Sequence, residues 1–380
     1  MAAVTISDIP ITPTKIQIIN RLEASSQVAT SLAAIKSAPP DQIHILQYDP
    51  SFSNLTSDSP THSLLFSTAS TTKNPFFHEA CVFLPEHDEL YITSNLLQAN
   101  SSSNLPTILI SRIKLTRSPT TNDISSASWV KMRPPPGIDM PNGGVNHDSG
   151  ILFCAQGNLS PTSGGIYHMP RSSPPRALVT NFHGRPFNSP NDVVVAKDGS
   201  IWFTDPCYGY EQDFRPPPKL PCQVYRFDPG TGDVRVVTDG LVKPNGIAFA
   251  PGEETLYVTD TGMISGDGGR DLSRPATIYA YTISLPHPGA PSLINKRIFA
   301  FAAEGVPDGI KCDIHGNVYA GCGDGIEVWD AAGTMLGRIL VPGGVANFCF
   351  GREGELFVCA EQRLWRVQLG GGTKGALLGV

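Results

Sequence analysis

Short apolar runs recur along the chain in pairs, and a tight turn carrying a polar residue or glycine introduces each pair. The pattern repeats six times between about residue 60 and the C-terminus. The runs are short, bounded by turns and rich in β-branched and aromatic residues, which is typical of strands. Successive units begin roughly 40 to 65 residues apart, the interval of four-stranded blades in a radial array. The pattern therefore predicts an all-β fold, a six-bladed β-propeller.

The opening turns of the units carry the candidate chemistry. They are residues 78–80, 141–144, 190–192, 244–246, 307–309 and 344–347, and the returning runs are 89–93, 150–153, 199–204, 255–259, 316–319 and 354–358. Radial blades place the start of each innermost strand at one mouth of the central channel, so the side chains of the opening turns should converge. Four of these turns carry an oxygen-bearing side chain at the matching place, namely Glu79, Asn191, Asn245 and Asp308, and a fifth turn carries Asn142. A ring of oxygens at a channel mouth predicts a site for a hard cation.

A simpler interpretation of the same residues is ordinary turn chemistry, because Asn and Asp are common in Pro-Asn-Gly turns. Glu79 argues against it. Glutamate is a poor turn former, and a carboxylate directly before an apolar strand needs a partner when it is buried.

The two ends of the chain predict how the propeller closes. Residues 1–40 do not fit the repeat and are expected to form a peripheral segment with a short helix over 26–37, while residues 41–380 form one propeller domain. The last unit runs out of chain after residues 363–367. A strand from the N-terminal side should therefore complete the final blade and leave no open edge, and Leu64–Thr68 is the expected closing strand.

Two segments exceed ordinary hairpin length, residues 209–218 and 261–275, and both should lie near the channel mouth. Long loops in such places commonly form a lid or a wall of the substrate site. Phe214 would then supply apolar contact with a substrate, and Arg215 a hydrogen-bonding fork for its ring or carboxylate oxygens. A surface ion pair of Arg215 with an acidic neighbour is the alternative, and for residues 262–269 a solvated excursion is equally open.

Charge and composition narrow the range of partners. The formal net charge is −6 with a pI near 5.8, and no Lys/Arg cluster is present, so neither nucleic acid nor an anionic membrane surface is an expected partner. No apolar run approaches a membrane span, and the N-terminus lacks a basic leader, so a cytoplasmic location is expected. Most of the eight cysteines lie in apolar strands and are expected to be reduced core thiols. Pairing of Cys312 with Cys322 and of Cys349 with Cys359 across hairpins is the alternative.

Several motifs resemble the SMP-30/gluconolactonase family of six-bladed propellers. They are the stretches NSPNDVV at 188–194, WFTDP at 202–206, KPNGI at 243–247 and YVTDTG at 257–262. The stretches around residues 208–216 and 319–325 are similar to those of the fungal lactonohydrolases, which open aldonolactones and pantolactone. The resemblance covers about residues 60–370. Two features depart from the family pattern. The signal sequence with which secreted fungal members begin is not seen here, and Asn146-His147-Asp148 is more polar than the corresponding residues of those members.

The resemblance implies one divalent ion, usually Ca²⁺, held by one Glu, two Asn and one Asp. Matched motif by motif, these ligands are Glu79, Asn191, Asn245 and Asp308, the set that the repeat selects. Asn142 stands where related lactonases contact substrate, and Asn191 is expected near the substrate as well. Two carboxylates and two amides leave positions on a dication for water or substrate.

The predicted function is metal-dependent hydrolysis of a small-molecule lactone. Asp308 is the first candidate for general base or nucleophile and Glu79 the second, with both serving only as ligands as the alternative. His78, His147 and His183 are weaker candidates for a proton shuttle. Two other functions remain open, namely an isomerase or cyclase acting on a fungal secondary metabolite and a binding propeller without turnover. The complete ligand set favours hydrolysis over mere binding, and serine-hydrolase and nucleotide-binding motifs are absent from the sequence.

Overall fold

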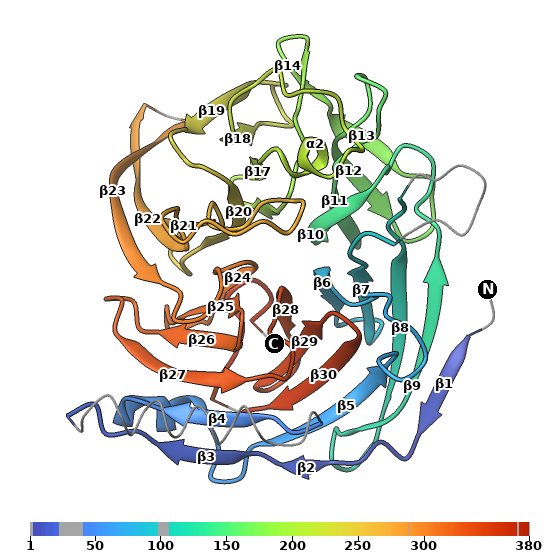
Figure 1. The fold of residues 1–380 in the computed structure, drawn as a ribbon, viewed down its shortest axis with the longest axis vertical. Coiled ribbons are helices and arrows are strands. Elements are labelled where there is room, and N and C mark those ends of the chain that lie inside the picture. The colour runs from blue at the N-terminus through green and yellow to red at the C-terminus, as the bar shows by residue number, and fades with distance from the viewer. Residues whose placement is uncertain (1–2, 23–40, 98–105, 288, 371, 380) are drawn as a thin grey trace.

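The computed structural model describes residues 3–22, 41–97, 106–287, 289–370 and 372–379. Six sheets stand around a central axis, with the innermost strand of each sheet facing that axis (Figure 1). The predicted all-β, six-bladed β-propeller is therefore confirmed.

Each blade begins at the axis with its innermost strand and continues outward. Blade one consists of β6 (Glu79–Leu84), β7 (Glu89–Thr93), β8 (Ile110–Arg117), β9 (Ile124–Met132) and β1 (Val4–Ser7). Blade two consists of β10 (Pro141–His147), β11 (Gly150–Ala155), β12 (Gly165–Pro170) and β13 (Arg176–Val179). Blade three consists of β16 (Val193–Val195), β17 (Ile201–Asp205), β18 (Gln223–Phe227) and β19 (Val234–Thr238).

The second half of the ring continues in the same order. Blade four consists of β20 (Pro244–Phe249), β21 (Thr255–Asp260), β22 (Thr277–His287) and β23 (Ala290–Phe301). Blade five consists of β24 (Ile310–Cys312), β25 (Val318–Cys322), β26 (Gly325–Trp329), β27 (Met335–Leu340), β4 (His44–Gln47) and β3 (Lys15–Ile18). Blade six consists of β28 (Asn347–Phe350), β29 (Glu355–Ala360), β30 (Arg363–Gln368), β5 (Thr61–Ser67) and β2 (Thr12–Pro13). Outside the blades lie the pair β14 (Asn181–Phe182) and β15 (Arg185–Pro186), the 3₁₀ helix η1 (Pro50–Leu55) and the one-turn helix α2 (Tyr208–Glu211).

The hydrophobic core is divided into layers between neighbouring blades. Six clusters of buried apolar side chains each draw on two adjacent blades, so the inner strands are apolar on both faces. Between blades two and three, for example, the rings of Phe203 and Tyr225 stack with centroids 5.4 Å apart, and Phe187 meets both edge-on. Burial on both faces explains why the sequence shows continuous apolar runs instead of strict alternation.

An N-terminal strand closes the ring. Strand β5 pairs antiparallel with β30, from Thr61 opposite Gln368 to Ser67 opposite Arg363. The closing strand predicted at Leu64–Thr68 is thus found in the predicted blade, but it starts at Thr61 and ends one residue earlier. Phe66 of this strand also reaches blade one, where its ring lies 5.5 Å from Trp129. Closure therefore joins the last blade to the first through packing as well as backbone pairing.

The described residues before position 41 extend the outer edges of three blades. Strand β1 pairs with β9 of blade one, β2 with β5 of blade six, and β3 runs parallel to β4 on blade five. These short strands cover edges that would otherwise expose unpaired N–H and C=O groups. The helix predicted over residues 26–37 lies outside the described residues.

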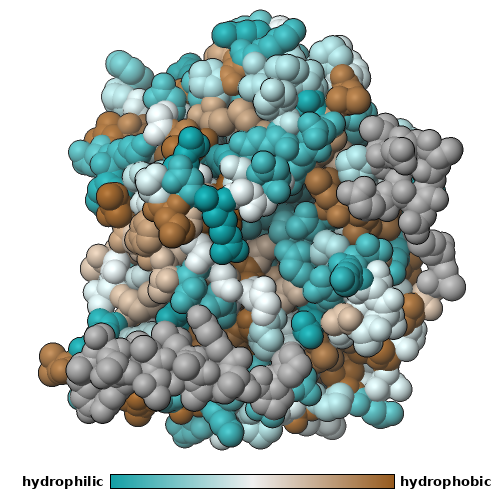
Figure 2. All heavy atoms as spheres, in the orientation of Figure 1, coloured by the Kyte–Doolittle hydropathy of each residue, from teal (hydrophilic) through white to brown (hydrophobic). Residues whose placement is uncertain are grey.

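Hydrophilic and hydrophobic residues are interspersed over the face shown in Figure 2. Within the described ranges, no helix combines the length and the apolar composition that a membrane crossing requires.

All eight cysteines are free thiols. In the ladders Cys349 faces Phe357 and Cys312 faces Val318, so the ten-residue spacing does not bring the proposed pairs into opposition. Instead Cys349 lies 3.5 Å from Cys81, sulfur to sulfur, across the boundary between blades six and one. The prediction of reduced core thiols agrees with this arrangement.

We expect Phe66→Ala to lower the free energy of unfolding by about 3–5 kcal/mol, because it empties the contact between the closing strand and blade one. Urea unfolding followed by tryptophan fluorescence measures the change. Ser67→Ala, on the exposed end of the same strand, should alter it by less than about 0.5 kcal/mol. Equal losses for the two variants would show that closure does not depend on this packing.

Candidate active site

The polar residues of the opening turns all belong to the start of an innermost strand. Glu79 is the first residue of β6, Asn142 and Asn245 are the second residues of β10 and β20, and Asn191 and Asp308 precede β16 and β24 by two residues. The innermost strands surround the axis in Figure 1. Because each is the first strand of its four-stranded repeat, all run the same way along the channel, and their starts share one end of it.

Neighbouring opening turns touch through their glycines. Gly143 donates its N–H to the carbonyl of Asn191 at 2.7 Å, and a Cβ at Gly143 would lie only 2.4 Å from that oxygen. A Cβ at Gly246 would likewise lie 2.3 Å from the carbonyl oxygen of Asp308. Neither glycine has a positive φ. Glycine is therefore required here by the close approach of two blades, and not by the left-handed backbone of a simple turn.

Buried threonines connect each blade to the next candidate residue. The hydroxyl of Thr93 donates to the carbonyl of Asn142 at 2.9 Å, that of Thr204 to Asn245 at 2.6 Å, and that of Thr259 to Asp308 at 3.0 Å. All three threonines are fully buried and sit near the end of the second strand of the preceding blade. This repeated bond fixes the backbone from which each candidate side chain projects into the channel end.

Blade six contributes Asn347, which holds Glu79. The amide of Asn347 donates to Glu79 Oε2 at 2.7 Å, while its own oxygen accepts from the N–H of Phe348 at 2.8 Å and from Lys311 at 3.4 Å. A Cβ at Gly309 would meet the Asn347 side chain at 2.5 Å, so the glycine of blade five makes room for it. Sequence reasoning identified Asn347 as part of the sixth opening turn but assigned it no role at the site.

Buried carboxyl groups are concentrated at this end of the channel. Burial raises the pKa of Asp308 well above its ordinary value, and the Glu79 carboxylate adds to the rise. Burial also raises the pKa of Glu79, against the opposing effects of His78 and the Asn347 amide. A third carboxylate, Asp192, is fully buried and lies 4.0 Å from the Lys311 ammonium. Buried carboxylates that raise one another's pKa create a place where positive charge is stabilised.

Two oxygens of the predicted ligand set, Asn191 Oδ1 and Asp308 Oδ1, are buried and have no hydrogen-bond partner among the described residues. Buried polar atoms without a partner are rare, because their desolvation is costly. No group of three or more His, Cys, Asp or Glu side chains among the described residues is placed to hold a metal. A cation at this end would therefore need the neutral oxygens of Asn191 and Asn245 together with the two carboxylates, a donor set that suits Ca²⁺.

The residue before Glu79 is itself paired. His78 Nδ1 lies 2.8 Å from Glu361 Oε1. Burial alone would lower the pKa of His78, but the Glu361 carboxylate raises it to about 10. His78 thus forms an ion pair beside the carboxylate cluster.

The two long segments meet beside Asn245. The Tyr208 hydroxyl lies 2.5 Å from Thr261 Oγ1 and also interacts with the Asn245 side chain. Lys243 forms an ion pair with Glu211 at 3.0 Å, and the same Glu211 oxygen accepts the N–H of Gly266 at 2.6 Å. The loops between the second and third strands of blades three and four are therefore joined to each other and to the backbone next to Asn245. Tyr208 is the aromatic residue that reaches the candidate ligands.

Phe214 and Arg215 are both buried, and Arg215 does not offer the free hydrogen-bonding fork that was predicted. Arg215 is buried, and its guanidinium donates to the carbonyls of Asn188, Phe187 and Asn158 at 2.8, 2.7 and 2.9 Å. Phe214 packs with Ile108 and Met140 in a small cluster of its own. Backbone carbonyls of two other loops accept the hydrogen bonds of the Arg215 guanidinium. Arg215 therefore neither points toward a substrate nor forms the alternative surface ion pair. The two side chains anchor the loop.

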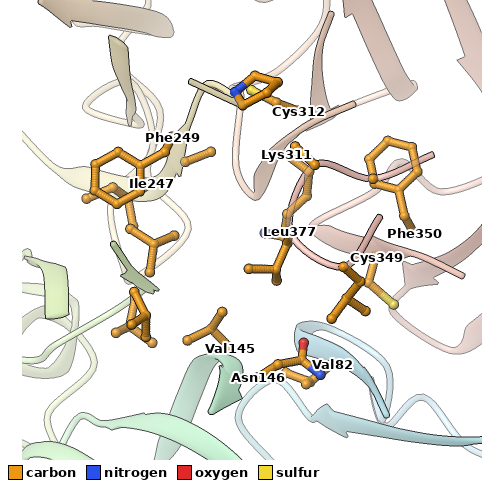
Figure 3. Close-up of a pocket in the computed structure, with 18 of the residues that line it drawn as sticks. Val82, Val145, Asn146, Ile247, Phe249, Lys311, Cys312, Cys349, Phe350 and Leu377 are labelled. Carbon is orange, nitrogen blue, oxygen red and sulfur yellow. The ribbon is translucent and has the colours of Figure 1, made fainter. Parts of the chain in front are cut away.

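A cavity of about 240 Å³ occupies the other end of the channel (Figure 3). Its walls include Val82, Val145, Ile247 and Phe249, from the later parts of the innermost strands, together with Lys311. Residues 375–378 of the C-terminal segment line it as well. The cavity is mainly apolar and is distinct from the end where Glu79 and Asp308 lie.

Comparison with known proteins agrees with the motifs. A family model described as SMP-30/Gluconolactonase/LRE-like region matches residues 139–362. Lactonohydrolase oryL of Aspergillus oryzae is 31% identical over 313 residues, which is 77% of this chain and 66% of that protein. A gluconolactonase of Zymomonas mobilis is 34% identical over 205 residues, 50% of this chain and 53% of that protein. The matched region thus spans less than two thirds of the length of either relative.

The fold also resembles solved structures. A gluconolactonase from Xanthomonas campestris, XC5397, superposes with a TM-score of 0.64 at 24% identity, covering 88% of this chain and 96% of that one. At this identity the likeness supports the propeller fold alone.

We expect Gly246→Ala to destabilise the protein by about 1–3 kcal/mol, because the added Cβ would force blades four and five apart at the Asp308 carbonyl. Gly252→Ala in the same blade is the matched control, since its Cβ would approach no atom closer than 3.8 Å. Urea unfolding midpoints and slopes of both variants give the comparison. A Gly246→Ala protein as stable as Gly252→Ala would refute the close-approach argument.

Proposed function

The chain belongs to the SMP-30/gluconolactonase/LRE-like family, and from that premise we propose that it hydrolyses a lactone to the hydroxy acid with the help of a divalent cation, Ca²⁺. Relatives named lactonohydrolase and gluconolactonase support the reaction class. The observation that carries the proposal is the buried, partnerless Asp308 Oδ1 in a ring of oxygen donors at one channel end.

Glu79, Asn191, Asn245 and Asp308 are the residues that would hold the cation. When bound, the cation supplies Lewis-acid polarisation of the lactone carbonyl and stabilises negative charge on its oxygen. Glu79 Oε2 is already occupied by the Asn347 amide, which orients the carboxylate toward its role as a ligand. The threonine bonds to the carbonyls of Asn245 and Asp308 keep the donors in place without rearrangement.

Asp308 is the residue to which we assign the proton transfer. Its Oδ1 has no partner, whereas one oxygen of Glu79 is already engaged, so Asp308 has the more available acceptor. Asp308 takes a proton from water as the water oxygen bonds to the lactone carbonyl carbon. The ring C–O bond then breaks, and the proton passes to the departing ring oxygen. Water is thereby added across the ester bond, and Asp308 is regenerated.

Two other residues face the same end of the channel and would contact the substrate. Tyr208 lies against Asn245 and closes one side of the site through its bond to Thr261. Asn142 is nine-tenths buried, and its side-chain oxygen accepts from the N–H of Gly143 at 3.0 Å. The amide N–H₂ of Asn142 is then the group that would donate to a lactone oxygen.

We expect Asp308→Asn to lower kcat by about 10²–10⁴-fold, because it removes the proton acceptor while preserving shape. Turnover is measured as acid release from a panel of aldonolactones, and circular dichroism checks the fold. Asp267→Asn, in the exposed part of the neighbouring loop, is the matched control and should leave kcat unchanged. Activity of Asp308→Asn above about a tenth of wild type would assign the base to another residue.

We expect calorimetry to show one Ca²⁺ bound per chain, and Asn347→Ala to weaken that binding by about 10–100-fold, because Glu79 loses the partner that orients it. Asn146→Ala, at the opposite end of β10, should bind Ca²⁺ like the wild type. Absence of Ca²⁺ binding by the wild-type chain would contradict the metal assignment directly, whatever the activity.

A further inference from the structure

The connection between β17 and β18 brings two cysteines together at its base. Asp205 and Gln223 form the last rung of the ladder between these strands; Cys222 directly precedes Gln223, and Cys207 follows Asp205 by two residues. Their sulfur atoms are 3.1 Å apart. The register of the sheet, and not the course of the loop between them, therefore sets this contact.

This pair differs from the other cysteines in exposure. Cys207 and Cys222 are only half-buried, whereas Cys81, Cys154, Cys312, Cys322, Cys349 and Cys359 are buried. Cys81 and Cys349 are also close, at 3.5 Å, but they are 2% and 8% exposed. A dissolved oxidant can thus reach the pair at the channel mouth but not the pair in the core.

The two thiols are chemically unequal. The hydrogen bond from Cys222 lowers the pKa of Cys207, and the same bond raises the pKa of Cys222. Cys207 therefore holds the thiolate more readily and is the attacking sulfur, while Cys222 is placed to resolve a mixed disulfide.

We propose that Cys207 and Cys222 form a reversible disulfide that closes residues 207–222 into a covalent ring beside the candidate site. The Cys207 thiolate attacks one sulfur of a small disulfide such as oxidised glutathione and releases one glutathione thiol. The Cys222 sulfur then attacks Cys207 in the mixed disulfide and releases the second glutathione. Two electrons and the two thiol protons pass from the cysteines to glutathione, so the exchange balances. This proposal goes beyond lactone hydrolysis and does not depend on it.

The covalent ring closed by the disulfide would contain Tyr208 and Arg215, the loop residues that contact or support the candidate site. Tyr208, which reaches Asn245, follows Cys207 directly, and Arg215 anchors the middle of the loop to the carbonyls of Phe187 and Asn188. The base of the loop is otherwise held by the Asn188 amide, which donates to Leu220 at 3.0 Å. A disulfide would fix the position of Tyr208 from the opposite side of the same base.

The test counts free thiols in the full-length protein. Protein reduced and then incubated with oxidised glutathione is quenched in acid, unfolded and alkylated with N-ethylmaleimide. Intact mass and peptide mapping then locate the adducts. We expect eight adducts before oxidation and six afterwards, with the loss confined to Cys207 and Cys222 and reversed by dithiothreitol. Eight adducts after oxidation, or a loss at other cysteines, would overturn the proposal.

Single variants test the order of attack. Cys222→Ser should retain one glutathione on Cys207 as a stable mixed disulfide, because the resolving thiol is gone. Cys349→Ser, which breaks the buried pair, is the matched control and should still lose two adducts at Cys207 and Cys222. A Cys222→Ser protein that instead forms an internal disulfide would assign the partner of Cys207 to another cysteine and refute the pair.

Discussion

The innermost strands approach one another so closely at one end of the channel that this contact governs the geometry of all six blades. Six blades around one axis leave so little space there that a Cβ at Gly143 or Gly246 would collide with a backbone carbonyl of the next blade. The glycines bring the backbones together, and the residues beside them are thereby brought to a common end of the channel. The same geometry that closes the ring assembles the candidate site.

Burying so many polar groups at one end of the channel costs desolvation free energy, and hydrogen bonds between blades offset part of that cost. Buried carboxylates and amide oxygens lose their hydration, and two of those oxygens find no partner among the residues that the structure describes. Threonine hydroxyls fix the backbone, and Asn347 holds Glu79, but these bonds leave Asp308 Oδ1 and Asn191 Oδ1 open. The bonded backbone around the candidate site thus leaves these two oxygens available to a ligand.

The surroundings of the site are also held from a distance. The closing strand β5 links the last blade to the first through its pairing with β30 and the contact of Phe66 with Trp129. On the mouth side, Lys243, Glu211 and Gly266 connect the loops of blades three and four, and Arg215 ties its loop to the carbonyls of Phe187 and Asn158. Ion pairs and hydrogen bonds therefore tie these two long loops to each other and to the neighbouring backbone.

Features that depend on local pattern could be predicted from the sequence. The recurring apolar runs and turns predicted six blades, because strand periodicity and turn preference are encoded by residues only a few positions apart. The opening turns of four of these units contain the candidate ligands Glu79, Asn191, Asn245 and Asp308. The incomplete last unit predicted a closing strand, and β5 lies close to the expected residues.

Side-chain contacts between different blades could not be predicted from the sequence and are seen only in the folded ring. Arg215 was expected to face a substrate, but its acceptors come from loops around residues 158 and 187 that no local pattern connects to it. The sequence also did not predict the role of Asn347 or the pairing of β1, β2 and β3 with the outer edges of three blades. It did not predict the contact of Cys207 with Cys222 either. The first two join strands or turns far apart in the chain, so they are set only when the ring is closed, whereas the cysteine contact is set by how β17 and β18 pair within blade three.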